Sequence, residues 1–162
     1  MRFLVQPAPD ALERARPPVR AFLAFAAVLL VAMVAHRAVQ GGLSPADLER
    51  LLEPAPGERL GPVALWEEVH QGAFLYGFLL LTLGSLLAVC PVAPRLRGGL
   101  LGVGTAAALT DLLAPFLGVL RPGFPGWAGL RIGGFLVASA ALLASTVLAW
   151  ATFGRRPRRA GG

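Results

Sequence analysis

The sequence predicts an all-α integral membrane protein, in which four membrane-spanning helices form an up-down bundle and a short amphipathic helix lies in the outer loop. Three observations support this fold class. Hydrophobic residues make up 56% of the 162-residue chain and only 15% of the residues are charged, against about 25% in soluble domains. The apolar residues fall in four blocks that are each long enough to cross hydrocarbon. Arginines gather at the ends of these blocks, as topology signals do.

The chain divides into three parts around these blocks. Residues 1–20 form a basic cytoplasmic N-terminal arm, residues 21–154 the transmembrane domain, and residues 155–162 a basic cytoplasmic tail. Within the transmembrane domain we expect helices at about 21–40, 69–92, 98–120 and 130–153, with an outer loop at 41–68. Pro17-Pro18 should break the chain ahead of the first helix. The first block could also be a cleaved signal peptide. Its apolar run is long for that role and no small-residue cleavage site follows, so we expect a retained helix.

The outer loop contains a helix start. Ser44 can cap the N-terminus, Pro45 fits the first turn, and Asp47 complements the helix dipole. Three leucines then share one face: Leu48, Leu51 and Leu52. This pattern predicts a short amphipathic helix that lies on the outer surface of the membrane.

The distribution of arginine predicts the orientation of the protein. The chain has fifteen arginines, no lysine and a net charge of +6. Ten arginines fall on the side of the termini and five on the other side, so the positive-inside rule places both termini in the cytoplasm and the protein in a bacterial inner membrane. Because the basic residues flank apolar blocks, they indicate topology rather than nucleic-acid binding. The expected partners are the lipid bilayer and other membrane proteins or further copies of the chain.

Glycines in the third and fourth blocks have the spacing of helix-packing motifs. Gly98 and Gly102 lie four residues apart, as do Gly129 and Gly133, and small residues at this spacing let membrane helices approach closely. The glycine-rich start of the third block begins a membrane helix and is not a phosphate-binding loop. We therefore expect these four glycines in a tight contact between the third and fourth helices.

Asp111 is the one charged residue near the middle of an apolar block. A carboxylate near mid-membrane costs about 2.5–3.5 kcal/mol on insertion scales, so Asp111 should face the bundle interior, protonated or hydrogen-bonded. Pro115, four residues on, should free the Asp111 carbonyl and kink the helix. Hydroxyl groups are the expected partners, from Tyr76, Thr82, Thr105 or Thr110. A structural polar group remains one interpretation of Asp111, and a proton relay or ligand contact the other.

His36 and His70 are the only histidines in the chain. One lies near the outer end of the first helix and the other at the start of the second, so antiparallel helices could bring them together. Such a pair could ligate a b-type haem, or a divalent metal with help from Glu67 or Glu68. Polar residues at a membrane interface also need no ligand, so no cofactor and no metal is predicted, with b-type haem as the alternative.

Several short motifs follow one another between residues 43 and 145: Ser44-Pro45-Ala46-Asp47-Leu48, Glu68-Val69-His70, Leu83-Gly84, Asp111-Leu112-Leu113 and Pro122-Gly123-Phe124. In this order the chain resembles a group of uncharacterised four-span bacterial inner-membrane proteins. In that group the second helix often begins with His-x-His, whereas here the second histidine would fall at Gly72. The resemblance implies a four-span membrane fold and brings no established activity.

Three functions fit these features. The first is a non-catalytic subunit or assembly partner of a larger inner-membrane complex, since no catalytic residues stand out and little of the chain lies outside the bilayer. The second is a small redox protein with b-type haem between His36 and His70. The third is a proton-coupled carrier that uses Asp111, which would need an oligomer.

Overall fold

The computed structural model describes residues 9–40, 42–52, 62–121, 124 and 126–154. These residues form five α-helices and no strand: α1 (Pro9–Val39), α2 (Pro45–Leu52), α3 (Pro62–Val89), α4 (Pro94–Leu120) and α5 (Gly126–Gly154). The four long helices contain apolar spans of 25 to 28 residues, and about 20 residues suffice to cross a membrane. The protein is therefore an all-α membrane bundle, as the sequence predicts. Residues 1–8 of the expected arm, 53–61 of the outer loop and the tail 155–162 lie outside the described residues.

The helices begin earlier than the apolar blocks indicate. Each of α1 to α4 begins at a proline, a residue that is favoured in the first turn because it lacks an N–H group and has a helical φ. The predicted bounds of α1, α3 and α4 start at their apolar runs and leave out these first turns. For example, α3 begins at Pro62 rather than near residue 69.

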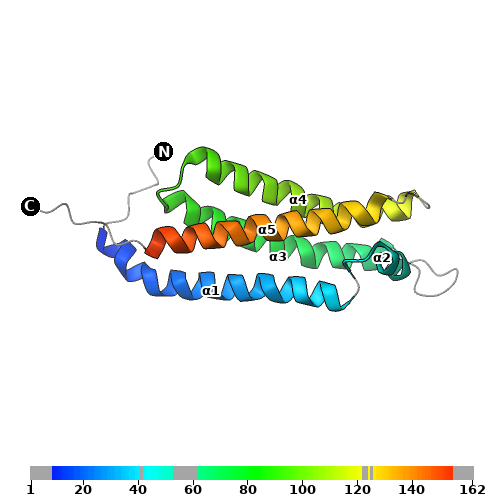
Figure 1. The fold of residues 1–162 in the computed structure, drawn as a ribbon, viewed down its shortest axis with the longest axis horizontal. Helices are drawn as coiled ribbons and strands as arrows, with labels where there is room; N and C mark the ends of the chain where they lie inside the picture. Colours follow the sequence, from blue (N-terminus) through cyan, green and yellow to red (C-terminus); the bar gives the residue numbers. More distant parts are fainter. Residues whose placement is uncertain (1–8, 41, 53–61, 122–123, 125, 155–162) are drawn as a thin grey trace, which may run out of the picture.

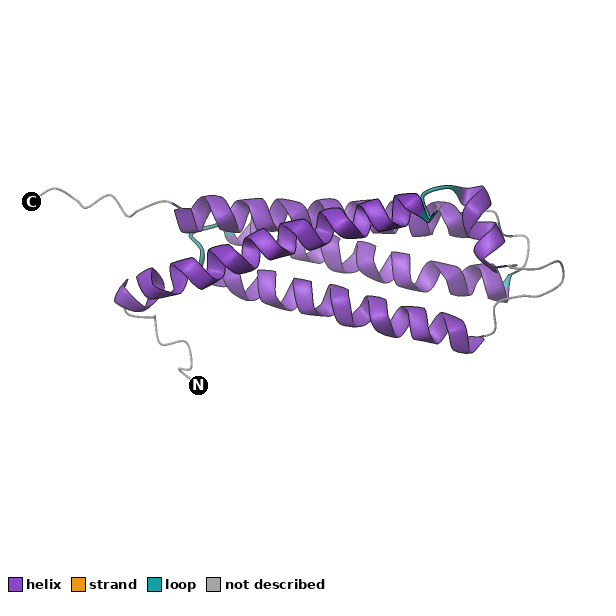
Figure 2. Cartoon of the chain, turned by 90° about the horizontal axis from the view of Figure 1, so that it is seen from below, coloured by secondary structure: helices purple, strands orange, loops and turns teal. Residues whose placement is uncertain are grey.

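The largest correction to a boundary concerns α1, which continues through Pro17 and Pro18 where we expected a break. Both prolines are exposed. The first turns of α1 project beyond the ends of the other helices (Figure 2). In this position water can hydrate the backbone carbonyls that the prolines leave without a helical hydrogen bond.

Consecutive long helices run antiparallel (Figure 1). One end of the bundle, the termini end, holds the start of α1, the turn between α3 and α4, and the end of α5. The opposite end, the α2 end, holds α2 together with the end of α1, the start of α3, the end of α4 and the start of α5. The central element is α5, which packs against all four other helices and most extensively against α4. By contrast, α1 packs mainly against α5.

An apolar core fills the bundle from its middle to the termini end. Leucines of α1 and α3 meet small residues of α4 and α5 there. Its fully buried side chains include Leu23, Leu79, Leu83, Leu87 and Leu142. Many other large apolar side chains point outward, which is the arrangement expected of helices that are surrounded by lipid.

The contact between α4 and α5 forms without the four glycines that the sequence analysis chose. A Cβ atom added at Gly98, Gly102, Gly129 or Gly133 would meet no atom of the described residues within 4 Å, and all four positions are exposed. The glycines at the contact include Gly134, where an added Cβ would lie 2.6 Å from the backbone nitrogen of Asp111, and Gly104, where it would lie 3.5 Å from the Cβ of Ala141. The prediction of a close contact between these helices is right, but the glycine spacing pointed to the wrong face of each helix.

The short helix α2 packs against the start of α5. Its Leu48 is fully buried in a small cluster with Trp127, Ala128 and Ile132 at the start of α5. The predicted start is confirmed, because α2 begins at Pro45 directly after Ser44, whose carbonyl accepts the first helical hydrogen bond from Leu48 N at 3.0 Å. Leu48 of this short helix is therefore buried against α5.

The turn between α3 and α4 is held by side chains at the termini end. The guanidinium of Arg97 donates to the carbonyl of Ala88 at 3.2 Å, so it satisfies a carbonyl that the end of α3 leaves free. Cys90 is buried in this turn. Burial raises the pKa of its thiol above the ordinary value, so Cys90 packs as a neutral small side chain.

Candidate functional site

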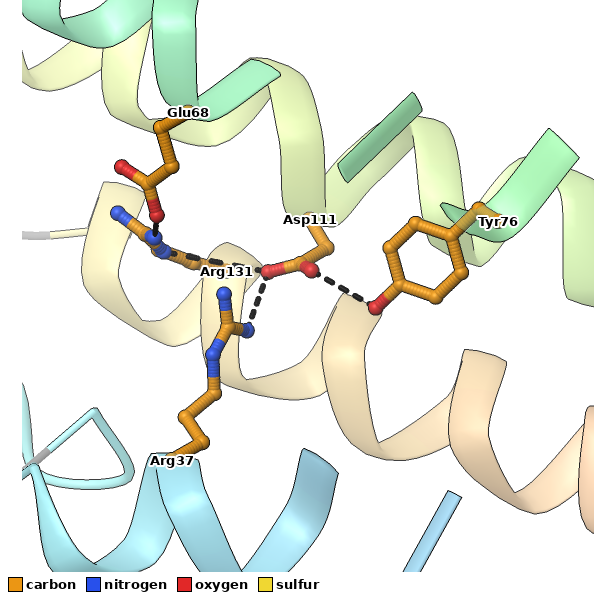
Figure 3. A network of polar contacts seen from close by, with 5 residues as sticks. All are labelled: Arg37, Glu68, Tyr76, Asp111 and Arg131. Carbon is orange, nitrogen blue, oxygen red and sulfur yellow. Dashed lines mark hydrogen bonds and ion pairs between the residues drawn. The ribbon is translucent and has the colours of Figure 1, made fainter. Parts of the chain in front are cut away.

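Asp111 of α4 lies at the centre of a polar cluster between the long helices. By the helical rise of 1.5 Å per residue it is about 26 Å from the start of α4, beyond the middle of the helix toward the α2 end. Its side chain is 3% exposed. Arg37 of α1 donates from Nη1 to Oδ1 at 2.6 Å, and the Tyr76 hydroxyl of α3 donates to Oδ2 at 2.9 Å (Figure 3). The carboxylate thus joins three helices.

Arg131 brings the fourth long helix, α5, to the same cluster. Its Nη2 donates to Oε1 of Glu68 on α3, and its Nε lies 3.9 Å from Oδ1 of Asp111 (Figure 3). The Arg131 side chain is only 8% exposed, whereas that of Glu68 is 51% exposed. We call Arg37, Glu68, Tyr76, Asp111 and Arg131 together the charged centre.

Two features of the chain let the charged centre form. Gly134 follows Arg131 by three residues, and its missing side chain allows α5 to lie against the backbone of Asp111. Phe135 lies beneath Arg37, with the guanidinium carbon 4.2 Å from the centre of the ring, which is a favourable cation–π geometry. The position of Arg37 therefore depends on α5 as well as on Asp111.

The charges of the centre balance, with two guanidinium groups and two carboxylates. This balance matters because an unpaired charge inside a membrane protein is costly, while paired and hydrogen-bonded charges are tolerated. The centre therefore acts as a polar link that ties α1, α3, α4 and α5 together near the α2 end.

A cavity of about 370 Å³ lies against the charged centre in the α2 half of the bundle. Residues of α1 and α3 form its sides, and residues of α4 and α5 close it. Its polar lining includes His36, Arg37, Gln40, Glu68, Gln71 and Tyr76. Its apolar lining includes Met33, Leu65, Val69, Leu75 and Phe135. The cavity is thus amphipathic, with both guanidinium groups on its wall.

The comparison with protein families gives a single informative match. Residues 58–159 match the model of the Aq_1264_TM family, described as a transmembrane helical domain. This chain belongs to that family. No curated protein and no solved structure matches the chain.

The Aq_1264_TM region covers most of the charged centre but not all of it. Glu68, Tyr76, Asp111 and Arg131 fall within the matched residues, whereas Arg37 on α1 lies ahead of them. The family domain accordingly contains α3, α4 and α5, and in this chain α1 adds the closest cationic partner of Asp111.

The hydroxyl groups predicted as partners of Asp111 form hydrogen bonds with different acceptors. Only Tyr76 bonds the carboxylate. Thr82, Thr105 and Thr110 each donate to the carbonyl four residues earlier in their own helix, a common pattern for these side chains in membrane helices. The backbone of α4 stays helical through Pro115, which is buried and lines the cavity.

Neither arginine of the charged centre was predicted as a site residue, because in the sequence both fit the role of topology signals. Arg37 lies in the last turn of α1 and Arg131 in the second turn of α5. Both positions are compatible with side chains that reach the interface. A signal was present, because Asp111 needed a polar partner, and Arg37 and Arg131 are the arginines within the long helices that lie toward the α2 end.

The two histidines are placed differently. Both are exposed, but His36 lines the cavity and His70 is not among the lining residues. Within the described part of the chain, no group of three or more His, Cys, Asp or Glu side chains is placed to hold a metal ion. At Gly72, where the related group has a second histidine, an added Cβ would collide with the end of the Leu112 side chain. Haem ligation by His36 and His70 stays a prediction.

Proposed function

We propose that the chain is a non-catalytic inner-membrane protein that acts as a subunit or assembly partner of a larger membrane complex. One observation carries this proposal: the glycine pairs of α4 and α5 face away from the bundle, with open space around each of them. Small residues four apart let a neighbouring membrane helix approach closely. Among the described residues nothing packs against these glycines, which supports their use in contact with a helix of another chain.

The surface around Gly129 and Gly133 supports this proposal. These glycines line an open groove between α4 and α5, together with Ala107, Thr110 and Val137. Its lining also includes the larger side chains of Phe124 and Leu130, but the glycines give another membrane helix room for close approach. The other pair, Gly98 and Gly102, lies on an exposed face of α4 nearer the termini end.

The charged centre favours a structural role over proton-coupled transport. A proton carrier needs a carboxylate that can release and rebind its proton during transport. The Asp111 carboxylate is instead fixed between Arg37 of α1 at 2.6 Å and Tyr76 of α3 at 2.9 Å. The centre therefore suits a fixed link between helices.

The orientation is part of the same proposal. The excess of arginine near the termini end supports a cytoplasmic location for that end in a bacterial cell. The α2 end, with the charged centre and the cavity, would then lie toward the outer side of the inner membrane.

The proposal is tested by the size of the particle that contains the chain. Membranes that carry the tagged protein are extracted in a mild detergent, and the mass of the protein particle is measured by native mass spectrometry. We expect a particle well above the 16.9 kDa of one chain. Gly102→Leu and Gly133→Leu should reduce it, because each adds a bulky side chain to a surface that needs close approach.

Ala32→Leu is the matched control, since Ala32 is an exposed small residue on α1 without a small residue four positions away. This variant should keep the large particle. Two differently tagged copies in one cell distinguish a homo-oligomer from a complex with another protein. A wild-type chain that is extracted only as a single 16.9 kDa species would contradict the proposal.

A further inference from the structure

The cavity beside the charged centre has the features of a ligand site. We propose that it binds an amphiphilic anion, a phosphate or carboxylate attached to an apolar body, and that Arg131 and Arg37 hold the anionic group. This proposal does not depend on the assembly role above, because it rests on side chains inside the bundle rather than on its outer surface.

The first reason for this proposal is that Arg131 has a hydrogen-bond donor free for an anion. Its side chain is more than nine-tenths buried and lines the cavity. Its Nη2 is bonded to Glu68, but its Nε is buried, has no hydrogen-bond partner among the described residues and lies 3.9 Å from Oδ1 of Asp111. A buried donor without a partner is costly, and a guanidinium presents a planar fork that matches phosphate and carboxylate. Arg131 therefore has unused capacity for an acceptor.

The second reason concerns Glu68, because an incoming anion can displace its carboxylate from Arg131. Its side chain is half exposed, so water can solvate the carboxylate once it leaves Arg131. Asp111, at 3% exposure, has no such alternative. An incoming anion would therefore take the place of Glu68 on Arg131, while Asp111 keeps its bonds to Arg37 and Tyr76.

Arg37 completes the anion site from the opposite side. It comes from α1, whereas Arg131 comes from α5, and the two guanidinium groups converge on Asp111 (Figure 3). Arg37 uses Nη1 for Asp111, and a guanidinium has five N–H donors in all. Its side chain is 19% exposed and also lines the cavity, so it can share an anion with Arg131.

The apolar residues that line the cavity determine which apolar body the ligand can have. Met33, Leu65, Val69 and Leu75 form a large part of the cavity wall on α1 and α3. A volume of about 370 Å³ lies at the small end of the range for ligand sites, roughly 300–1,000 Å³. The cavity thus suits an anionic group with a short apolar body. Both a free amphiphilic acid and the headgroup region of an anionic lipid offer this chemistry.

The test measures binding of octyl phosphate by isothermal titration calorimetry to the full-length protein in phosphatidylcholine nanodiscs, with empty nanodiscs as the blank. Octanol, which has the same apolar body without the charge, is the comparison ligand. We expect saturable binding of octyl phosphate and none of octanol. Equal binding of both would overturn the proposal, and so would a failure of octyl phosphate to bind.

Two substitutions of neighbouring acids make the test specific. Glu68→Gln removes the competitor of the ligand on Arg131, so it should tighten binding by about tenfold, or about 1.4 kcal/mol. Glu67→Gln removes the same charge from an exposed residue that does not line the cavity, and it should leave the affinity unchanged. If both variants tighten binding equally, the effect is one of overall charge and the site is refuted.

Arg131→Gln supplies the loss-of-binding variant and should weaken octyl phosphate binding at least about tenfold. The folding of this variant is checked by its melting temperature without octyl phosphate. Unchanged affinity in a folded Arg131→Gln protein would refute the proposal.

Repeating the titration in phosphatidylglycerol nanodiscs identifies whether the natural ligand is a lipid or a free acid. Loss of octyl phosphate binding there supports a lipid headgroup as the natural occupant, and unchanged binding supports a free amphiphilic acid.

Discussion

The two halves of this bundle are held together in different ways. In the half next to α2, polar contacts cross between helices, since Asp111 of α4 bonds Arg37 of α1 and Tyr76 of α3. In the half next to the termini, leucines and alanines form the core. The polar contacts there include hydroxyls of Ser145 and Thr146 that bond carbonyls of their own helix.

This difference separates interactions that define the arrangement of helices from those that only fill space. Without water between the helices, apolar packing in a membrane discriminates weakly among helix arrangements, because lipid is equally apolar. An ion pair between α1 and α4 has one register in which it can form. The α2 half therefore specifies where α1 lies, and the termini half contributes packing once α1 is there.

The largest effect should come from breaking the ion pair. Asp111→Ala leaves the guanidinium of Arg37 without its carboxylate at a largely buried position, and we expect a loss of about 3–5 kcal/mol in the free energy of unfolding. The measurement is an SDS titration of the purified protein in mixed micelles, followed by circular dichroism.

The control for this prediction removes both charges. Arg37→Met combined with Asp111→Asn leaves no unpaired charge, so this double variant should be clearly more stable than Asp111→Ala alone. If the double variant loses as much stability as the single one, the ion pair is not what holds α1 in place.

In the termini half, the corresponding test removes packing. Leu83 is fully buried in the apolar core, and Leu83→Ala should lower the unfolding free energy by about 2–5 kcal/mol, because the space it leaves cannot close completely. Leu81 lies two residues away with 74% of its surface exposed, and Leu81→Ala should have little effect. The same SDS titration measures both. Equal losses at the two positions would mean that Leu83 is not packed as described.

The sequence predicted the fold well and the polar contacts poorly, for a physical reason. Apolar block length and arginine placement are local properties, so four spans could be derived without knowing how helices pack. Which face of a helix turns inward depends on its neighbours. Glycine spacing marked Gly129 and Gly133 on α5, but the contact with α4 uses Gly134, one residue further along.

The residues of the charged centre could likewise be predicted only in part from the sequence. Asp111 stood out because one charge in an apolar block is visible in the sequence, and its interior position could be argued from cost. Its partner Arg37 belongs to a helix 74 residues earlier and looked like an interfacial residue. Long side chains near helix ends can turn either to the interface or to the interior, and only the packing of α1 on α5 decides between them.

The smallest effects should come from deleting single hydroxyl groups, and they give the sharpest comparison of the two halves. Tyr76→Phe removes a hydroxyl that donates to a carboxylate on another helix, and hydrogen bonds to charged groups contribute about 1.5–3 kcal/mol. Ser145→Ala removes a hydroxyl that donates to the carbonyl of Ala141 in the same helix. That carbonyl already belongs to the helical backbone, so we expect a change within about 0.5 kcal/mol. Both residues are buried, so burial alone predicts similar losses in the SDS titration, whereas contacts between helices predict a loss only at Tyr76.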